Sequence, residues 1–500
     1  MENTGRIKQA VAYPASRILF GGTTPAEVEF ELRHISRVDR AHLVMLAECG
    51  IISKEQAARL LELILLLDAD DFAPLHVASA PRGIYLAYED FLISKVGPET
   101  GGVLHTARSR NDLNATVLCL RLRGPYLALL RESLRLQAVL IRRARRYADV
   151  VMPAYTHYQA AVPITYGHYL AGIGCALSRD IEGLFAGAQG LDHCPLGAGA
   201  AGGTSFPIDP ARTAALLGFD HPVTHSIDAV AARDLVLRLL SGVTVLGITL
   251  SRLAADLLLW TTAEFGFLTL PDRLVGSSSM MPQKRNVYLL EHVQGRSAAA
   301  LGAFVSAATA MHAKPYTNSI SVGTEAVSHV WGALQSLIEA LTLARLIVAG
   351  ACPQPTAMNE RAEAGYTTAT ELANRLVAEG GMPFRSAHHI VGRAVSEAVL
   401  SNTTSLTDAL ARLQTNGGSL HHPTELKPRN VVDASIYGGG PGRSSLDACL
   451  KAMYNEWHHH AQRKREQARK WATASSNLDE VVLRLCRSIT ESRISEPALQ

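Results

Sequence analysis

The chain has 500 residues, of which 47% are hydrophobic and 19% are charged, and its net charge is only +3. This length predicts two or three domains, and the small net charge argues against nucleic acid or a membrane surface as a partner. Aromatic residues make up 6% of the chain, whereas alanine and leucine are abundant, which favours packed helices over sheets. The predicted fold class is therefore mainly α.

The cysteine and N-terminal patterns indicate a protein of the cytoplasm. The seven cysteines form no CxxC pair and their number is odd, so we expect reduced thiols rather than a disulfide framework. The charged N-terminal residues are followed by no apolar stretch, so we expect no secretory signal. One of the longer charge-free runs, 160–178, is interrupted by Pro163, Gly167 and Gly172, which indicates a buried helix rather than a membrane span.

The first hundred residues mix short helical patterns with loops, and the clearest pattern predicts two helices joined at Gly50. From about Asn114 onward, apolar residues recur at three- and four-residue spacing over five segments of more than about 20 residues. These segments are 118–147, 164–187, 231–265, 289–311 and 327–349. Their length predicts a bundle of long helices. Several are apolar nearly all round, so we expect the bundle to pack against copies of itself in a homo-oligomer.

Beyond about residue 356 the pattern changes to shorter helices and Gly-rich turns. The predicted domains are therefore an N-terminal helical domain (1–110), a central long-helix bundle (111–355) and a small C-terminal helical domain (356–500). The histidine run 458–460 lies in a charged helical stretch with only Glu456 as a neighbouring acid. We interpret it as a solvated helix face, and no metal site is predicted.

Three polar segments interrupt the apolar pattern at helix ends, and the first is HTARSRND at 105–112. Two arginines flank a serine just before a long helix. Cations, a hydroxyl, an amide and free backbone N–H groups together suit a bound carboxylate. Taken alone, the same pattern also fits an ordinary helix N-cap with surface arginines.

The other two polar segments are YTHYQAAVP at 155–163 and GSSSMMPQKRN at 276–286. The former leads polar groups into a buried helix, where each needs a hydrogen-bond partner. In the latter, polar and apolar residues follow neither the two-residue period of a strand nor the period of an amphipathic helix. Its composition alone fits a Ser-rich connector between helices. It is followed by Glu291 and His292.

Together these segments resemble the fumarase/aspartase superfamily and, within it, argininosuccinate lyase. MPQKRN at 281–286, preceded by SSSM, fits the superfamily loop GSSxMPxKxN, and HTARSRND is similar to HTGRSRND of the lyase. THYQ at 156–159 matches THxQ, and PLGAGAAGGTSFPID at 195–209 resembles PLGSGALAGTxxPID. Residues 369–395 are similar to the C-terminal domain of the lyase. The resemblance is good over about residues 100–400 and loose over the first 90.

The resemblance implies a three-domain fold in which the five-helix bundle packs with its copies into the twenty-helix core of a homotetramer. It further implies active sites shared between three subunits. The implied reaction cleaves a C–N bond on a succinyl unit by anti elimination and releases fumarate, with no metal or organic cofactor. Because the proton removed lies beside a carboxylate, the enzyme must stabilise a doubly negative aci-carboxylate.

The resemblance also assigns roles. Ser278 takes the place of the catalytic serine, whose alkoxide needs backbone N–H groups and a cation, and the Gly-Ser loop would close over the substrate. Lys284 would hold a substrate carboxylate. His157 would protonate the leaving nitrogen or belong to the proton relay, with Glu291 orienting it. The implied substrate-binding residues are Arg108, Ser109, Asn111, Thr156, Gln159, Ser279, Met281 and Asn286.

The match to argininosuccinate lyase fails at two places. The loop continues KRNVY at 284–288, where the lyases have KKNPD. Beyond Pro315 the lyases carry YNKDLQEDK, whose side chains grip the arginine end of the substrate, whereas this chain has NSISVGTEA at 318–326. The positions of Lys, Gln and Lys are occupied by Ile320, Gly323 and Ala326. Because specificity built on hydrogen bonds needs its donors, we predict an N-substituted aspartate other than argininosuccinate.

Several alternatives remain open from the sequence. Lyases that add amines to fumarate, such as those for ethylenediamine-disuccinate, suit a pocket with fewer fixed donors, and so does a dedicated biosynthetic step. Argininosuccinate lyase proper is an alternative within the same chemistry. An alternative of another class is an inactive structural protein of the lens-crystallin kind, against which the presence of Ser278 and His157 argues. A nucleotide site at 197–203 does not fit, because that segment has no flanking strand and no following lysine.

Overall fold

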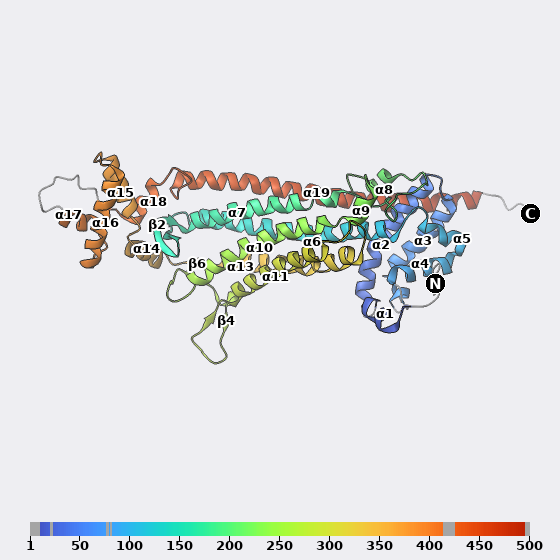
Figure 1. Cartoon of the computed structure of the whole chain (residues 1–500), viewed down its shortest axis with the longest axis horizontal. Helices are drawn as coiled ribbons and strands as arrows, with labels where there is room; N and C mark the ends of the chain where they lie inside the picture. The colour runs from blue at the N-terminus through green and yellow to red at the C-terminus, as the bar shows by residue number, and fades with distance from the viewer. Residues whose placement is uncertain (1–10, 21–23, 77–79, 81–82, 414–425, 496–500) are drawn as a thin grey trace, which may run out of the picture.

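The computed structural model describes residues 11–20, 24–76, 80, 83–413 and 426–495. The molecule is elongated, with long helices lying side by side along its length (Figure 1). The N-terminal helices gather at one end and the short C-terminal helices at the other. The mainly α fold class is therefore confirmed. All seven cysteines lie in the described residues, and none of them forms a disulfide there.

The N-terminal helices form the first part of the main core. Helix α2 begins with a capping box between Thr24 and Glu27, and α2 and α3 are joined through Gly50, whose φ of 67° suits glycine. The two-helix prediction for this region is confirmed. The elements are α1 (Tyr13–Phe20), α2 (Pro25–Glu48), α3 (Lys54–Ala69), η1 (Ala73–Leu75), α4 (Ile84–Val96), α5 (Pro98–Gly101) and η2 (Gly102–His105).

The five predicted long segments are all helices. They are α6 (Arg110–Arg146), α7 (Tyr166–Gly187), α10 (Asp234–Trp260), α11 (Tyr288–Met311) and α13 (Val330–Gly350). Helix α6 packs on α7 and α13, while α10 packs on α7, α11 and α13. Their leucine-rich faces are buried together with the N-terminal helices in one large core. This bundle positions the polar segments, which lie at the ends of its helices.

Short elements connect the long helices. The antiparallel strand pairs are β1 (Val151–Thr156) with β2 (Gln159–Thr165), β3 (Leu268–Thr269) with β6 (Cys352–Pro353), and β4 (Gly276–Ser277) with β5 (Arg285–Asn286). The short helices are η3 (Gln189–Asp192), α8 (Pro210–Leu217), α9 (Ser226–Ala231), η4 (Asp272–Leu274), the π-helical turn η5 (Ser321–Glu325) and α12 (Ala326–Ser328).

The C-terminal part contains both short helices and one very long one. The elements are α14 (Pro355–Ala364), α15 (Ala369–Ala378), α16 (Phe384–Leu400), α17 (Leu406–Leu413), α18 (Pro428–Ala434) and α19 (Arg443–Ser495). Helices α15 to α17 enclose a separate small core. The expectation of shorter helices is confirmed for α14 to α18, but it was wrong for α19, which has 53 residues and packs along α6 and α7. The domain boundaries remain predictions.

The histidine run on α19 is only partly a solvated face. His458 and His459 are exposed, as expected, whereas His460 is buried with its Nε2 3.2 Å from a carboxylate oxygen of Glu182. In the part of the chain that the structure describes, no three His, Cys, Asp or Glu side chains gather as a metal site would require.

Apolar side chains remain exposed on the central helices of the single chain. Helix α10 and the segment Ser321–Gly350 are long and apolar enough to cross a membrane, a property that core helices of soluble proteins share. Less than half of each apolar window, 44%, is buried within the chain. The exposed apolar residues include Val245, Ile248, Leu259, Leu301, Val305 and Leu346. A face of this kind requires a covering surface.

Candidate active site

The first polar segment caps the N-terminus of α6. The Ser109 hydroxyl accepts the N–H of Asn111 at 3.2 Å, and the Asp112 carboxylate accepts the N–H of Ser109 at 3.0 Å. Asp112 is fully buried, and its second oxygen accepts the N–H groups of Gly197 and Gly199 at 3.1 and 2.9 Å. One carboxylate therefore fixes the helix start against the Gly-rich loop.

Arg108 points into the N-terminal domain and away from solvent. Its side chain is fully buried, where Nη1 donates to the Asp39 carboxylate and Nη2 donates to the Tyr85 hydroxyl at 3.0 Å. Burial alone would lower the pKa of Arg108, but the charge of Asp39, its hydrogen bond to Arg108, and the nearby Tyr85 and Asp112 together raise it. We therefore correct the assignment of Arg108 as a carboxylate-binding residue, because its guanidinium is already paired inside the fold.

Arg110 is a further candidate that the sequence analysis did not name. It is exposed in the first turn of α6, beside the half-buried Asn111. A cation at this position lies next to the free N–H groups of the helix N-terminus, which suits an anion. The sequence offers two arginines on either side of Ser109, and only the position of the partner Asp39, 69 residues from Arg108, distinguishes them.

The second polar segment is the tip of the β1–β2 hairpin. His157 and Tyr158 have φ values of 51° and 64°, and the flanking Thr156 and Gln159 pair across the strands. A two-residue turn in which both residues have a left-handed backbone conformation usually contains Asn-Gly. His157 and Tyr158 therefore each carry roughly 1–3 kcal/mol of backbone strain. All four side chains are exposed, and within the described residues that of His157 makes no hydrogen bond. The strained tip presents His157 outward.

The third polar segment is a loop between β4 and β5 that projects from the bundle (Figure 1). The oxygen of Ser278 accepts the backbone N–H groups of Met280 and Met281 at 3.3 and 3.0 Å. Arg285 anchors the base of the loop through Asp272, at 2.6 Å. Two N–H donors aimed at one serine oxygen stabilise negative charge on it, as an alkoxide base requires.

Most of the remaining predicted residues of this segment are exposed. Ser279, Met281 and Lys284 are exposed in the loop, and Asn286 is half-buried with its Nδ2 3.4 Å from the carbonyl oxygen of Ser277. Glu291 is exposed in the first turn of α11.

A single chain does not bring the three polar segments together. Helix α6 separates the first from the second, and its 37 residues span about 55 Å. The second segment lies at the opposite end of the bundle from α8 and α9 (Figure 1). One chain therefore does not place His157 against Asn111, and no hydrogen bond among the described residues joins Glu291 to His157. A common site requires parts from different copies.

The segment 318–326 lies at the same end of the bundle as the first polar segment. The amide of Asn111 donates to the carbonyl of Ala200 at 2.9 Å, and Ser226, the first residue of α9, donates to the next carbonyl, that of Ala201, at 2.7 Å. Asp228 of α9 accepts a hydrogen bond from the Tyr316 hydroxyl. These contacts connect the helix start, the Gly-rich loop and the segment beyond Pro315 within one chain.

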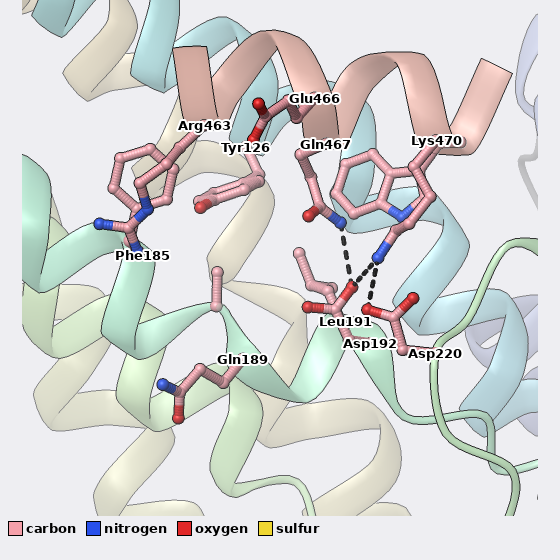
Figure 2. A pocket seen from close by; sticks show the side chains of 12 residues that line it. Tyr126, Phe185, Gln189, Leu191, Asp192, Asp220, Arg463, Glu466, Gln467 and Lys470 are labelled. Atoms are coloured by element: carbon pink, nitrogen blue, oxygen red, sulfur yellow. Dashed lines mark hydrogen bonds and ion pairs between the residues drawn. The ribbon is translucent and has the colours of Figure 1, made fainter. Parts of the chain in front are cut away.

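A separate cleft of about 470 Å³ lies between α6, η3 and α19 (Figure 2). Its cations are already neutralised, since Lys470 lies 2.7 Å from Asp192 and 2.8 Å from Asp220. None of the predicted site residues lines it. The residues that line it are Tyr126, Phe185, Ala188, Gln189, Leu191, Asp192, Asp220, Arg463, Glu466, Gln467, Lys470 and Trp471. This cleft therefore carries no candidate for the chemistry.

Known family models and known proteins match most of this chain. Residues 46–302 match a family described as lyase, and residues 366–423 match the argininosuccinate lyase C-terminal family. Argininosuccinate lyase of Methanothrix thermoacetophila is 36% identical over 83% of this chain and 85% of its own length. That of Geobacillus thermodenitrificans is 34% identical over 86% and 94%, respectively. The crystal structure of EDDS lyase in complex with formate has a TM-score of 0.84 and 30% identity, covering 92% of this chain and 93% of that one.

Proposed function

The chain belongs to the argininosuccinate lyase family and is a carbon–nitrogen lyase that releases fumarate, and we propose that its substrate is an N-substituted aspartate whose amine is not arginine. The segment 318–326 carries this proposal. Ile320 is 67% exposed, Gly323 has no side chain and Ala326 is fully buried, so none of the three offers a donor to a guanidinium or an amino acid. The similarity to EDDS lyase supports an aminopolycarboxylate amine.

In the proposed reaction, Ser278 acts as the base. Its alkoxide, held by the N–H groups of Met280 and Met281, removes a proton from the carbon beside a carboxylate of the aspartyl unit. The electron pair moves into that carboxylate to give the aci-carboxylate, next to Lys284. The C–N bond then breaks, His157 donates a proton to the departing nitrogen, and fumarate remains. Each donor to the developing charge contributes roughly 10²- to 10³-fold in rate.

The other polar side chains of the three segments would position the substrate. Ser109, Arg110 and Asn111 would bind one carboxylate at the start of α6. Thr156 and Gln159, on the hairpin that carries His157, would bind the other. Ser279, Met281 and Asn286 would line the loop, and Glu291 would orient His157. These roles follow from the family motifs and from the exposed positions of the side chains.

We propose that the sites form in a homotetramer of the cytoplasm, with each of the three polar segments supplied by a different subunit. Two observations support this assembly. The segments lie far apart in one chain, and the apolar faces of α10 and α11 are left uncovered by it. Packing these faces against copies would bury them in a twenty-helix core.

The proposal is tested by fumarate release, followed by ultraviolet absorbance, with argininosuccinate and ethylenediamine-disuccinate offered separately. Turnover of the second compound alone, abolished by Ser278→Ala, is expected. Argininosuccinate lyase proper is the alternative, favoured by the name of the relatives at 34–36% identity, and rapid turnover of argininosuccinate would establish it. Silence of the wild-type protein with every N-substituted aspartate would favour the inactive structural homologue.

Shared sites are tested by mixing two inactive variants. Ser278→Ala and His157→Asn should each abolish turnover, whereas tetramers reassembled from both should recover part of it, because some sites then receive both intact residues. The two variants mixed without reassembly are the control. Failure of recovery in verified hybrids would contradict a site built from different chains.

A further inference from the structure

Arg233 is a buried cation without an acidic partner. It is the residue before α10, is 7% exposed, and donates from Nη1 to the carbonyl oxygen of its neighbour Ala232 at 2.6 Å. Its Nε finds no acceptor, and no carboxylate among the described residues pairs with it. Burial lowers its pKa. An uncompensated buried charge is costly, so a partner from outside the chain is expected.

Two other buried arginines have partners of a kind that Arg233 lacks. Arg108 pairs with Asp39. Arg123 donates to the carbonyl of Leu217 at 2.7 Å, and its guanidinium lies 4.2 Å from the ring centroid of Phe219. Among the described residues, Arg233 has beside it neither a carboxylate like that of Arg108 nor an aromatic ring like that of Arg123.

The guanidinium of Arg233 lies beside Gly323. A Cβ at Gly323 would lie 3.9 Å from Nη2 of Arg233 and 3.3 Å from Oδ1 of Asn318. A longer side chain at this position would lie against the guanidinium, whereas glycine makes no side-chain contact with it. Gly323 is one of the three positions at which the chain departs from the lyase motif YNKDLQEDK. The loss of a side chain thus occurs beside a buried cation that has no acidic partner among the described residues.

This cation belongs to the end of the bundle where the first polar segment lies. Arg233 follows α9 by two residues, and α9 packs against α6. The N-terminus of α10 adds its free N–H groups, since Arg233 caps that helix without a side-chain hydrogen bond. A guanidinium beside a helix N-terminus binds a carboxylate well.

We propose that Arg233 binds a carboxylate carried by the leaving amine. The substrates are then N-substituted aspartates in which the amine is itself an amino acid or an aminocarboxylate. This inference rests on the proposed function, because it assigns the amine side of the same site. It excludes simple alkylamines as the preferred leaving group.

The test measures binding of amines to the intact oligomer by calorimetry in saturating fumarate. Glycine, β-alanine, 4-aminobutyrate and 6-aminohexanoate are compared with alkylamines of equal chain length, and arginine is measured alongside. At least one amino acid should bind 10-fold or more tightly than its matched alkylamine. That advantage should fall about 10- to 100-fold in Arg233→Met, as for the loss of a charge-assisted hydrogen bond.

Gly323→Gln is the second variant, in case Arg233→Met does not fold. It should cover the guanidinium and remove the same advantage, while fumarate binding and the circular dichroism spectrum stay unchanged. Equal binding of amino acids and alkylamines by the wild-type protein, or an advantage that survives either folded variant, overturns the proposal.

The outcome separates this inference from the proposed function. Ser278→Ala should keep the binding preference, because the base takes no part in binding the amine. A binding preference for amino acids without turnover of any N-substituted aspartate would overturn the proposed function but not the binding role of Arg233. Tight, Arg233-dependent binding of arginine would overturn only the identity of the amine.

Discussion

The two arginines that flank Ser109 should respond to substitution in opposite ways. Arg108→Met removes one partner of an ion pair in which both side chains are fully buried. Breaking such a pair costs about 3–5 kcal/mol, because Asp39 is left charged and unpaired. Arg110 is exposed, so Arg110→Met should change the free energy of unfolding by less than about 0.5 kcal/mol. Its loss should instead lower kcat/KM about 10- to 100-fold, through a missing carboxylate contact.

The two effects are measured on the same preparations. Urea unfolding is followed by circular dichroism at one protein concentration, because the midpoint of an oligomer depends on concentration. Fumarate release gives kcat/KM. The double variant Asp39→Leu, Arg108→Met is the matched control. It removes both charges and should recover most of the lost stability, since a buried pair replaced by apolar groups is often neutral.

The reasoning would be refuted by the reverse pattern. If Arg108→Met unfolds at the wild-type midpoint and loses kcat/KM, while Arg110→Met keeps full activity, then Arg108 contacts the substrate. The buried pair with Asp39 would in that case not exist in the working enzyme. A stable Arg108→Met variant with a destabilised double variant would also contradict the burial argument.

Two further predictions concern stability near the same segment. Ala107 has a φ of 58°, so Ala107→Gly should raise the free energy of unfolding by about 0.5–1 kcal/mol, and an unchanged or lower urea midpoint would contradict this. Burial lowers the pKa of His42 to about 3, from about 6.5 in the unfolded chain, so only the unfolded state gains its proton as the pH falls. The contribution of this residue to the free energy of unfolding should therefore be constant above pH 6.5. Below pH 6.5 it should fall by about 1.4 kcal/mol per pH unit. Replacement by His42→Gln should make the pH dependence of the urea midpoint shallower between pH 6.5 and 4.5, and an identical slope would reject the assignment.

The long helices could be predicted because their signal is local. Apolar residues at helical spacing over more than 20 residues, as in 231–265, leave little alternative to a buried helix. The polar segments were found because each breaks that pattern at a helix end. Helix α19 was missed because its buried residues, such as Leu450 and Trp471, are spaced among many charged ones. Its stability comes from packing along α6 and α7, which the local pattern does not reveal.

The roles of individual polar residues needed tertiary information. Whether Arg108 or Arg110 faces solvent depends on where Asp39 lies, and no spacing within 105–112 contains that fact. His460 looked solvated for the same reason, since Glu182, which lies against it, belongs to another helix. The motifs drew attention to three polar segments, and the fold determines which side chains of each segment are exposed.

Within one chain, the proposed catalytic residues and the proposed amine-binding residues lie in different parts of the bundle. The proposed base on the β4–β5 loop and the proposed acid on the β1–β2 hairpin lie away from the end of the bundle that carries Arg110, Arg233 and Gly323. Helix α11 alone, with 24 residues, puts about 36 Å between the loop and the segment beyond Pro315 in the same chain. Substitutions in 318–326 therefore change the amine side of a site without straining the loop of their own chain. Since the loop would reach that site from another subunit, a lyase of this architecture can exchange its leaving group while the geometry around Ser278 stays the same.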